Sequence, residues 1–152
     1  MDIEVTSNSV EETISLGEKI GSQLKGGEVI ALIGPLGSGK TRLIKGIAAG
    51  AGAEDAQRVT SPTFVIMNEY AASDGRLVIY HIDAYRLESA KQLEMIGFDE
   101  LCSPSSVVLI EWADKVATIL KNINCIRIQM SHSGITARKI QFENLPDYMD
   151  LS

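Results

Sequence analysis

Residues Gly34-Pro35-Leu36-Gly37-Ser38-Gly39-Lys40-Thr41 have the pattern of a phosphate-binding loop, and this stretch decides the fold. The apolar run at residues 29–33 precedes it and predicts a buried parallel strand. Between residues 43 and 51 apolar side chains recur at helical spacing, so the loop should open a helix. A strand, a glycine-rich loop and a helix in this order surround an anion with backbone N–H groups and the positive end of the helix. The sequence therefore predicts a nucleoside triphosphate site in an α/β protein.

Individual residues of this loop have separate predicted roles. Its glycines allow positive φ and let the backbone come close to the phosphates. Lys40 can reach the β- and γ-phosphates, and the Thr41 hydroxyl can ligate Mg²⁺. The alternative is a glycine-rich turn that binds no ligand. The predicted ATP-binding residues of this stretch are Gly37, Ser38, Gly39, Lys40, Thr41 and Arg42.

Length and composition limit what kind of protein this is. The chain has 152 residues, which predicts one domain over residues 1–145 followed by an acidic, loosely packed tail at 146–152. A net charge of −6 argues against unaided binding to RNA or DNA. The sequence shows no secretory signal and no membrane-spanning run, so we expect a cytoplasmic protein. Cys102 and Cys125 lack metal-site spacing and are interpreted as reduced thiols.

The rest of the pattern predicts a sheet that is mixed rather than wholly parallel. Asp74-Gly75 is a hairpin turn, and strands joined by a tight turn are antiparallel. Ser9 and Glu12 form a capping box that begins the first helix, which should end at Gly26-Gly27. We therefore expect an α/β, P-loop NTPase-like three-layer fold, with a mixed, mainly parallel central sheet flanked by helices. Strands are predicted at residues 3–6, 29–33, 64–70, 77–83, 107–110, 123–130 and 137–143, and later helices at 89–96 and 113–120.

Two carboxylates follow buried strands, where a Mg²⁺ site in a triphosphate-binding protein needs one. Glu111 ends the apolar run at 107–110, and Asp83 ends the run at 78–82. The alternative for each is a carboxylate that caps the turn or helix that follows it. Either residue could also orient the attacking water, and the sequence does not separate them.

Polar residues alternate at the end of the second run. His81, Asp83 and Tyr85 should share one face of the strand and its exit, where they could orient the γ-phosphate or a metal-bound water. The alternative is a buried hydrogen-bonded cluster. Arg86 should point the other way, as a phosphate ligand or as a surface ion-pair partner.

Two further features could respond to the nucleotide. The hydroxyl-rich segment Thr60-Ser61-Pro62-Thr63 could order on the γ-phosphate as a switch loop does, or could be an ordinary turn. Trp112 directly follows Glu111, and it could be a core residue or a partner-facing or gating residue.

Taken together and in order, these motifs resemble those of the TsaE family, a family of small bacterial ATPases with the older name YjeE. The resemblance covers roughly residues 3–138, nearly the whole chain. It is carried by Gly34 to Thr41, by Val59-Thr60-Ser61-Pro62-Thr63-Phe64, by His81-Ile82-Asp83-Ala84-Tyr85-Arg86-Leu87, and by Glu111-Trp112 after its apolar strand.

The resemblance implies a role in placing threonylcarbamoyl on the tRNA adenosine beside the anticodon. It implies that the chain binds the TsaD–TsaB pair of proteins, in which TsaD transfers the group. ATP binding and hydrolysis would drive the cycle between turnovers, and tRNA would be met only indirectly through that complex. By position, Lys40 would contact the phosphates, and Thr41, Glu111 and Asp83 would serve Mg²⁺. The residues implied as switch or partner-facing are Ser61, Pro62, Thr63, Phe64, His81, Tyr85 and Trp112, and those implied near the adenine are Ser9 and Arg138.

Three functions are therefore compared. The leading hypothesis is a Mg²⁺-dependent ATPase that is slow alone, because the sequence shows no evident arginine finger. A small-molecule kinase would need an arginine-bearing lid, which the region after Glu111 does not suggest. A nucleotide-binding adaptor without catalysis would keep its function in a Lys40→Ala variant.

Overall fold

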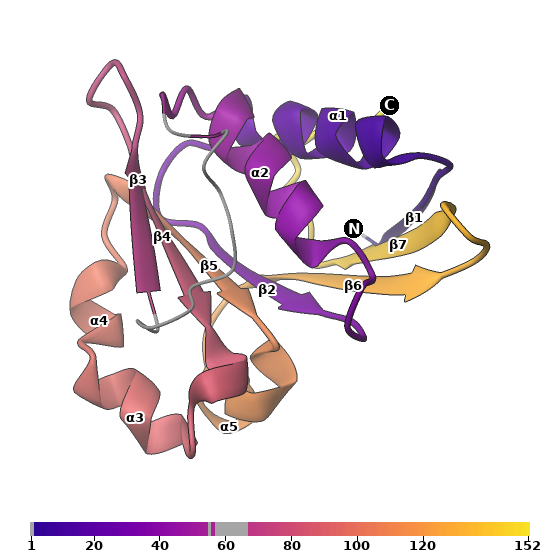
Figure 1. The fold of residues 1–152 in the computed structure, drawn as a ribbon. Coiled ribbons are helices and arrows are strands. Elements are labelled where there is room, and N and C mark those ends of the chain that lie inside the picture. Colours follow the sequence, from indigo (N-terminus) through magenta and orange to yellow (C-terminus); the bar gives the residue numbers. More distant parts are fainter. Residues whose placement is uncertain (1, 55, 57–66) are drawn as a thin grey trace.

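The computed structural model describes residues 2–54, 56 and 67–152, and the arrangement of its elements is shown in Figure 1. Within this part of the chain, seven strands form one sheet in the order β1-β7-β6-β2-β5-β4-β3. The middle strands β6, β2, β5 and β4 are parallel, whereas β1-β7-β6 at one end and β4-β3 at the other are antiparallel. The strands are β1 (Ile3–Ser7), β2 (Val29–Ile33), β3 (Met67–Ala71), β4 (Val78–Asp83), β5 (Ser106–Glu111), β6 (Ile126–His132) and β7 (Arg138–Glu143).

Helices cover both faces of this sheet, which confirms the three-layer α/β fold expected from the sequence (Figure 1). The long helices α1 (Val10–Gly21) and α2 (Lys40–Gly50) pack with Ile30, Leu32 and other strand residues into one core. The opposite face is covered by the short elements α3 (Ala90–Met95), α4 (Phe98–Leu101), η3 (Ala113–Val116) and α5 (Ala117–Leu120). None of the helices in the described residues has the length and apolar character needed to cross a membrane.

Strand burial explains why the middle of the sheet could be read from the sequence. All six residues of β5 are buried, as are the first four of β2, because helices cover both faces of these strands. The strands at the ends alternate between buried and exposed residues, as in β7.

Glycine lets α1 and α2 meet backbone to backbone. A Cβ atom at Gly17 would lie 2.4 Å from the carbonyl oxygen of Leu43, and one at Gly46 would lie 2.2 Å from that of Ile14. Gly21 and Gly50 extend the contact, with virtual Cβ distances of 2.1 Å to the carbonyl oxygens of Ile47 and Glu18 respectively. The helix that begins at the phosphate loop is thereby held directly against α1.

The predicted N-terminus of α1 is confirmed and its predicted end is wrong. The Glu12 N–H donates to Ser9 Oγ at 3.1 Å, whereas the Glu12 carboxylate accepts from the N–H of Asn8 instead of Ser9. The helix ends at Gly21 rather than Gly26, and Leu24 stays buried beyond it. The apolar pattern of the helix runs on to Leu24 because the connecting turn also contributes to the core, so the pattern placed the end of the helix too late.

Three other boundaries differ from expectation. The predicted helix at 113–120 consists of η3 followed by α5, after a left-handed residue at Trp112. The first part of the predicted strand at 64–70 lies outside the described residues, and β3 runs from 67 to 71. The last hairpin begins at Ile126 rather than residue 123.

The C-terminal tail is packed, in contrast to the loose segment expected. Gln23 on the turn after α1 exchanges two hydrogen bonds of 2.7 Å with the backbone of Asp150. Met149 is buried in the α1–α2 core. Local acidity did not reveal these contacts because their partners lie more than a hundred residues away in the sequence.

Candidate nucleotide-binding site

The phosphate loop connects β2 to α2, at the carboxyl ends of the parallel strands. α2 begins at Lys40, and Gly39 caps it with φ of 100°. Gly37 has φ of 78°, so two of the three loop glycines adopt the left-handed conformation that a side chain would strain. Gly34 does not have positive φ, but a Cβ atom there would lie 2.7 Å from the carbonyl oxygen of Met130, so this glycine allows a close backbone approach.

Two cations hold the carbonyl oxygens of this loop. Lys40 Nζ donates to the oxygens of Gly34 at 2.5 Å and Pro35 at 3.0 Å. From β7, Arg138 Nε donates to the oxygen of Ser38 at 3.1 Å, and a terminal nitrogen of Arg138 donates to that of Gly37 at 3.3 Å. Arg138 therefore contacts the loop itself, and its implied place near the adenine stays a prediction.

The residues present suit a polyphosphate. Among the described residues, the Ser38 hydroxyl is the buried side-chain polar group that has no hydrogen-bond partner. Such an orphaned group within a glycine-rich loop at a helix N-terminus suits an anion supplied by a ligand. Burial lowers the pKa of Lys40, and the nearby Glu111 carboxylate acts against this effect. A partly buried ammonium group and a nearby carboxylate therefore suit a ligand that carries negative phosphates together with a metal cation.

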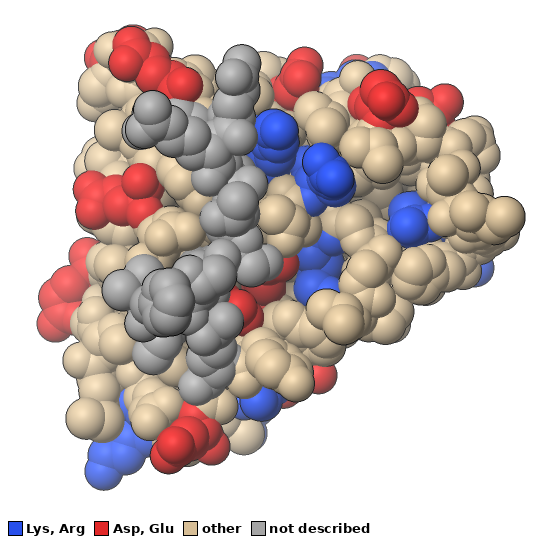
Figure 2. Space-filling model, in the orientation of Figure 1, with Lys and Arg blue, Asp and Glu red and all other residues tan. Residues whose placement is uncertain are grey.

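A cavity of about 370 Å³ opens beside the loop. Figure 2 shows Lys and Arg gathered over the middle of this face, with acidic residues mostly toward its edges, although the whole chain carries a charge of −6. The cavity brings together the predicted ATP-binding residues Gly37, Ser38, Gly39, Lys40, Thr41, Arg42, Ser9 and Arg138, and it adds Glu111, Trp112 and the exposed Leu36 and Ile135.

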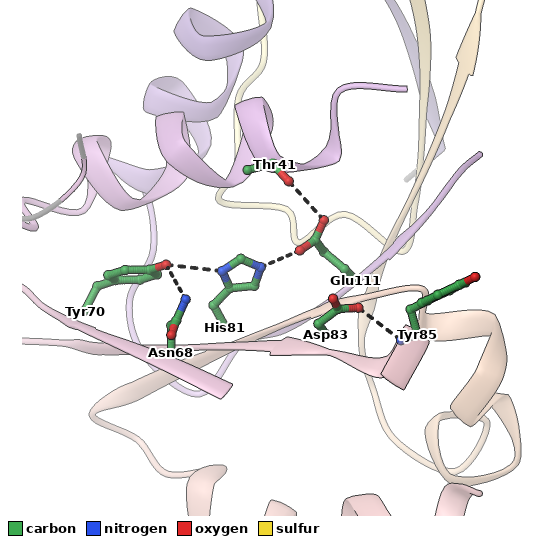
Figure 3. Close-up of polar contacts among 7 residues, drawn as sticks. All are labelled: Thr41, Asn68, Tyr70, His81, Asp83, Tyr85 and Glu111. Atoms are coloured by element: carbon green, nitrogen blue, oxygen red, sulfur yellow. Dashed lines mark hydrogen bonds and ion pairs between the residues drawn. The ribbon is translucent and has the colours of Figure 1, made fainter. Parts of the chain in front are cut away.

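The two predicted metal carboxylates lie on neighbouring strands but have different contacts. Thr41 Oγ1 donates to Glu111 Oε1 at 3.3 Å, next to the phosphate loop (Figure 3). Asp83 on β4 is in register with Glu111 on β5. The Oδ1 atom of Asp83 accepts from the N–H of Tyr85 at 3.0 Å. Asp83 therefore caps the turn after its strand, which was its alternative role, and it does not line the cavity.

These contacts suit Mg²⁺ rather than a metal held by the protein alone. In the part of the chain that the structure describes, no group of three or more His, Cys, Asp or Glu residues forms a metal cage. Mg²⁺ in triphosphate sites is commonly held by one or two protein oxygens together with phosphates and waters. Thr41 and Glu111 fit that requirement.

His81 and Tyr85 do not share a face, in contrast to the expected alternation. His81 is fully buried, with its Nε2 atom 2.6 Å from Glu111 Oε2, so its ring is not on the protein surface. Tyr85 is 60% exposed on the 3₁₀ turn η2 (Ala84–Arg86), because the extended backbone ends at Asp83. The predicted switch segment, Ser61 to Phe64, lies outside the described residues.

Trp112 belongs to an aromatic and cationic cluster at the mouth of the site. Its ring centre lies 4.0 Å from Lys40 Nζ and 5.1 Å from the ring centre of Tyr85. The Nζ atom of Lys115 lies over the Tyr85 ring, 4.9 Å from its centre. Trp112 thus lines the cavity and also packs, partly buried, against the core on that face of the sheet, and its implied partner-facing role stays a prediction.

Sequence reasoning missed Tyr70 on β3, whose hydroxyl lies 3.3 Å from His81 Nδ1. The available signal was the predicted hairpin, because its two strands must pair. The register of that pairing, with Asn68 opposite His81 and Tyr70 opposite Ile79, depends on the structure.

The chain is similar to several known proteins in sequence and in fold. A family model described as "Threonylcarbamoyl adenosine biosynthesis protein TsaE" matches residues 7–140. The tRNA threonylcarbamoyladenosine biosynthesis protein TsaE of Treponema pallidum is 40% identical over 114 residues, which is 75% of this chain and 81% of the relative. Its namesake from Bacillus subtilis is 38% identical over 132 residues, covering 87% and 79% of the two chains. The crystal structure of Bacillus subtilis YdiB matches with a TM-score of 0.74 and 30% identity, over 98% of this chain and 89% of that one.

Proposed function

This chain belongs to the TsaE family, which acts in tRNA threonylcarbamoyladenosine biosynthesis, and we propose that within that pathway it is a Mg²⁺-dependent ATP hydrolase. The observation that carries the proposal is the contact between Thr41 and Glu111 beside the phosphate loop. It places a hydroxyl and a carboxylate, the two oxygen ligands that such a Mg²⁺ site draws from the protein, at one point.

Each residue of the site has a role in this proposal. The loop N–H groups and Ser38 bind the phosphates, and Arg138 fixes the loop that presents them. Lys40 exchanges its carbonyl partners for phosphate oxygens and stabilises the charge that develops in the transition state. Thr41 and Glu111 would hold Mg²⁺, which would supply further positive charge.

The attacking water needs an oriented carboxylate, and both Asp83 and Glu111 are candidates. They end adjacent parallel strands in register, so both carboxylates belong to the same edge of the sheet. Comparing Asp83→Asn with Glu111→Gln separates the two, because a metal ligand changes the Mg²⁺ requirement and a residue that only orients water does not.

We further propose that hydrolysis is slow in the isolated chain and is completed in a complex with TsaD and TsaB. The acidic chain, with a net charge of −6, suits contact with proteins rather than with tRNA directly. The exposed Tyr85 contacts the partly exposed Trp112, which lines the cavity, so a protein bound to Tyr85 could sense the nucleotide.

The test measures ATP turnover by this chain alone, with TsaD, with TsaB and with both. We expect slow turnover alone and strong stimulation only when all three proteins are present. Lys40→Ala should abolish turnover, and in cells it should abolish tRNA modification, whereas an adaptor without catalysis would retain modification. Rapid turnover by the chain alone would contradict the dependence on partners.

A further inference from the structure

A row of buried side chains connects the phosphate loop to the far end of the sheet (Figure 3). Glu111 on β5 accepts from Thr41 with one oxygen, and its other oxygen lies 2.6 Å from His81 Nε2 on β4. His81 Nδ1 lies 3.3 Å from the Tyr70 hydroxyl on β3, and Asn68 Nδ2 donates to that hydroxyl at 3.4 Å. Four secondary-structure elements thus contribute to one hydrogen-bonded row.

The chemistry of these groups sets the direction of each bond. An ionised carboxylate only accepts, so His81 Nε2 must carry the proton that it shares with Glu111. In the tautomer that carries its proton on Nε2, the Nδ1 atom is an acceptor, to which the Tyr70 hydroxyl can donate. The Asn68 amide donates to the oxygen of the same hydroxyl. With the Nε2–H tautomer of His81, each of these three bonds joins a donor to an acceptor.

Burial makes this arrangement restrictive. His81 is 0% exposed, Glu111 is 2% exposed and Tyr70 is 5% exposed. Away from water, each group depends on its protein partners, so a missing bond is not replaced at low cost. The row therefore limits how the Glu111 carboxylate can turn.

We propose that His81 and Tyr70 are positioning residues for the Mg²⁺ site. His81 holds one oxygen of Glu111, so that the other is directed toward Thr41, and Tyr70 fixes the tautomer and ring orientation of His81. Neither residue lines the cavity, so both act through Glu111 rather than on the nucleotide. This inference rests on the proposed function, because it takes Glu111 as a metal ligand. Outer hydrogen-bond partners of metal ligands commonly change metal affinity by about 10–100-fold when they are removed.

The experiment measures binding of a non-hydrolysable ATP analogue by calorimetry over a series of Mg²⁺ concentrations and in EDTA. For His81→Leu we expect the half-saturating Mg²⁺ concentration to rise about tenfold or more, with binding in EDTA unchanged. Tyr70→Phe keeps the ring and removes the hydroxyl, and we expect a rise of about threefold. His81→Gln can still donate to Glu111 and should recover most of the loss. Tyr148→Phe removes a hydroxyl that contacts Glu28, away from the site, and serves as the matched control.

Nitrogen-15 NMR of the histidine rings gives a readout that needs no ligand. The chain has two histidines, so the signals of His81 are identified by their loss in His81→Gln. We expect the Nε2–H tautomer alone in the wild-type protein and a mixture of tautomers in Tyr70→Phe.

Two kinds of failure are distinguishable. If the wild-type protein binds the analogue without any dependence on Mg²⁺, the proposed metal site is wrong and this inference falls with it. If the wild-type protein depends on Mg²⁺ but Tyr70→Phe and folded His81→Leu match it, only the positioning role is wrong. Should His81→Leu not fold, Tyr70→Phe and the NMR tautomer decide the question.

Discussion

Lys40 Nζ lies 4.0 Å from the centre of the Trp112 ring while it donates hydrogen bonds to the carbonyl oxygens of Gly34 and Pro35. The backbone of Trp112 has φ of 57°, in the left-handed region that bulky residues rarely adopt. Strain of this kind persists where the surrounding structure holds it and often marks a functional position. On the proposed function, the ammonium group would change these contacts with the ring and the two carbonyls when it binds phosphate oxygens.

This contact predicts an optical signal. Trp112 is the single tryptophan of the sequence, so intrinsic tryptophan fluorescence reports on this position alone. We expect ATP or ADP with Mg²⁺ to change the emission, because Lys40 moves away from a contact of about 0.5–1 kcal/mol. In Lys40→Met the emission should already differ without nucleotide, whereas Lys45→Met on the same helix should behave as the wild-type protein. Unchanged wild-type emission at nucleotide concentrations that saturate binding by calorimetry would refute this.

The Thr41 hydroxyl predicts a selective effect of two substitutions. Thr41→Val keeps the branched shape and removes the oxygen that faces Glu111, so ATP turnover with TsaD and TsaB should fall on the order of a hundredfold through weakened metal binding. Thr41→Ser retains the hydroxyl and should keep most of the activity. The measurement is ATP hydrolysis as a function of Mg²⁺ concentration. Equal loss in both variants would indicate a packing role instead.

The sequence predicted those parts of the site that depend on neighbouring residues. The loop from Gly34 to Thr41, the strand before it and the Ser9 cap all follow from local backbone and hydrogen-bond preferences. The carboxylate at Glu111 also followed, because it ends a run of fully buried residues. The three-layer fold followed from the alternation of apolar strands with helical patterns.

Contacts between distant segments could not be predicted in the same way. The bond from Arg138 to the oxygen of Ser38 joins residues 100 positions apart, and no local pattern specifies it. Tyr70 depends on the pairing register of β3 with β4, where a shift of one residue would turn it away from His81. The alternation at His81, Asp83 and Tyr85 failed because period-2 reasoning holds only while the backbone stays extended.

The close approach of α1 and α2 predicts a sharp loss of stability. Gly17→Ala adds a Cβ at a position 2.4 Å from the oxygen of Leu43, so the helices must separate, and we expect unfolding free energy to fall by about 1–3 kcal/mol or more. Ser15→Ala lies on the exposed side of the same helix and should change stability by less than about 0.5 kcal/mol. Denaturant unfolding monitored by circular dichroism measures both. Equal stability of the two variants would show that the interface can accommodate a methyl group.

The contact between Tyr148 and Glu28 predicts a dependence on alkaline pH. The Tyr148 hydroxyl donates to Glu28 Oε2 at 2.5 Å, and burial, followed by this bond, raises the pKa of Tyr148 above its usual value. Because the folded-state pKa is raised, the contribution is fully present below about pH 10, the pKa of an unfolded tyrosine. It is then lost as pH rises toward the folded-state pKa.

Titration of phenolate absorbance measures this directly. One tyrosine of the wild-type protein should ionise late, and Tyr148→Phe should remove that late component. The variant should also lose the corresponding part of the fall in stability above pH 10. The difference between the two curves is the titration of Tyr148. If that difference is the curve of an ordinary tyrosine, the assignment is wrong.

At the four glycines of the contact between α1 and α2, backbone meets backbone, with no side chain there that could repack. A rearrangement of the nucleotide site therefore has little freedom to tilt α2 alone, because α1 would have to travel with it as one rigid body. If the proposed nucleotide enters and leaves, we expect movement at lining residues outside the two helices, such as Trp112, whose ring contacts Lys40. Hydrogen exchange would then show whether backbone amides near Trp112 lose protection while those of α1 and α2 keep it.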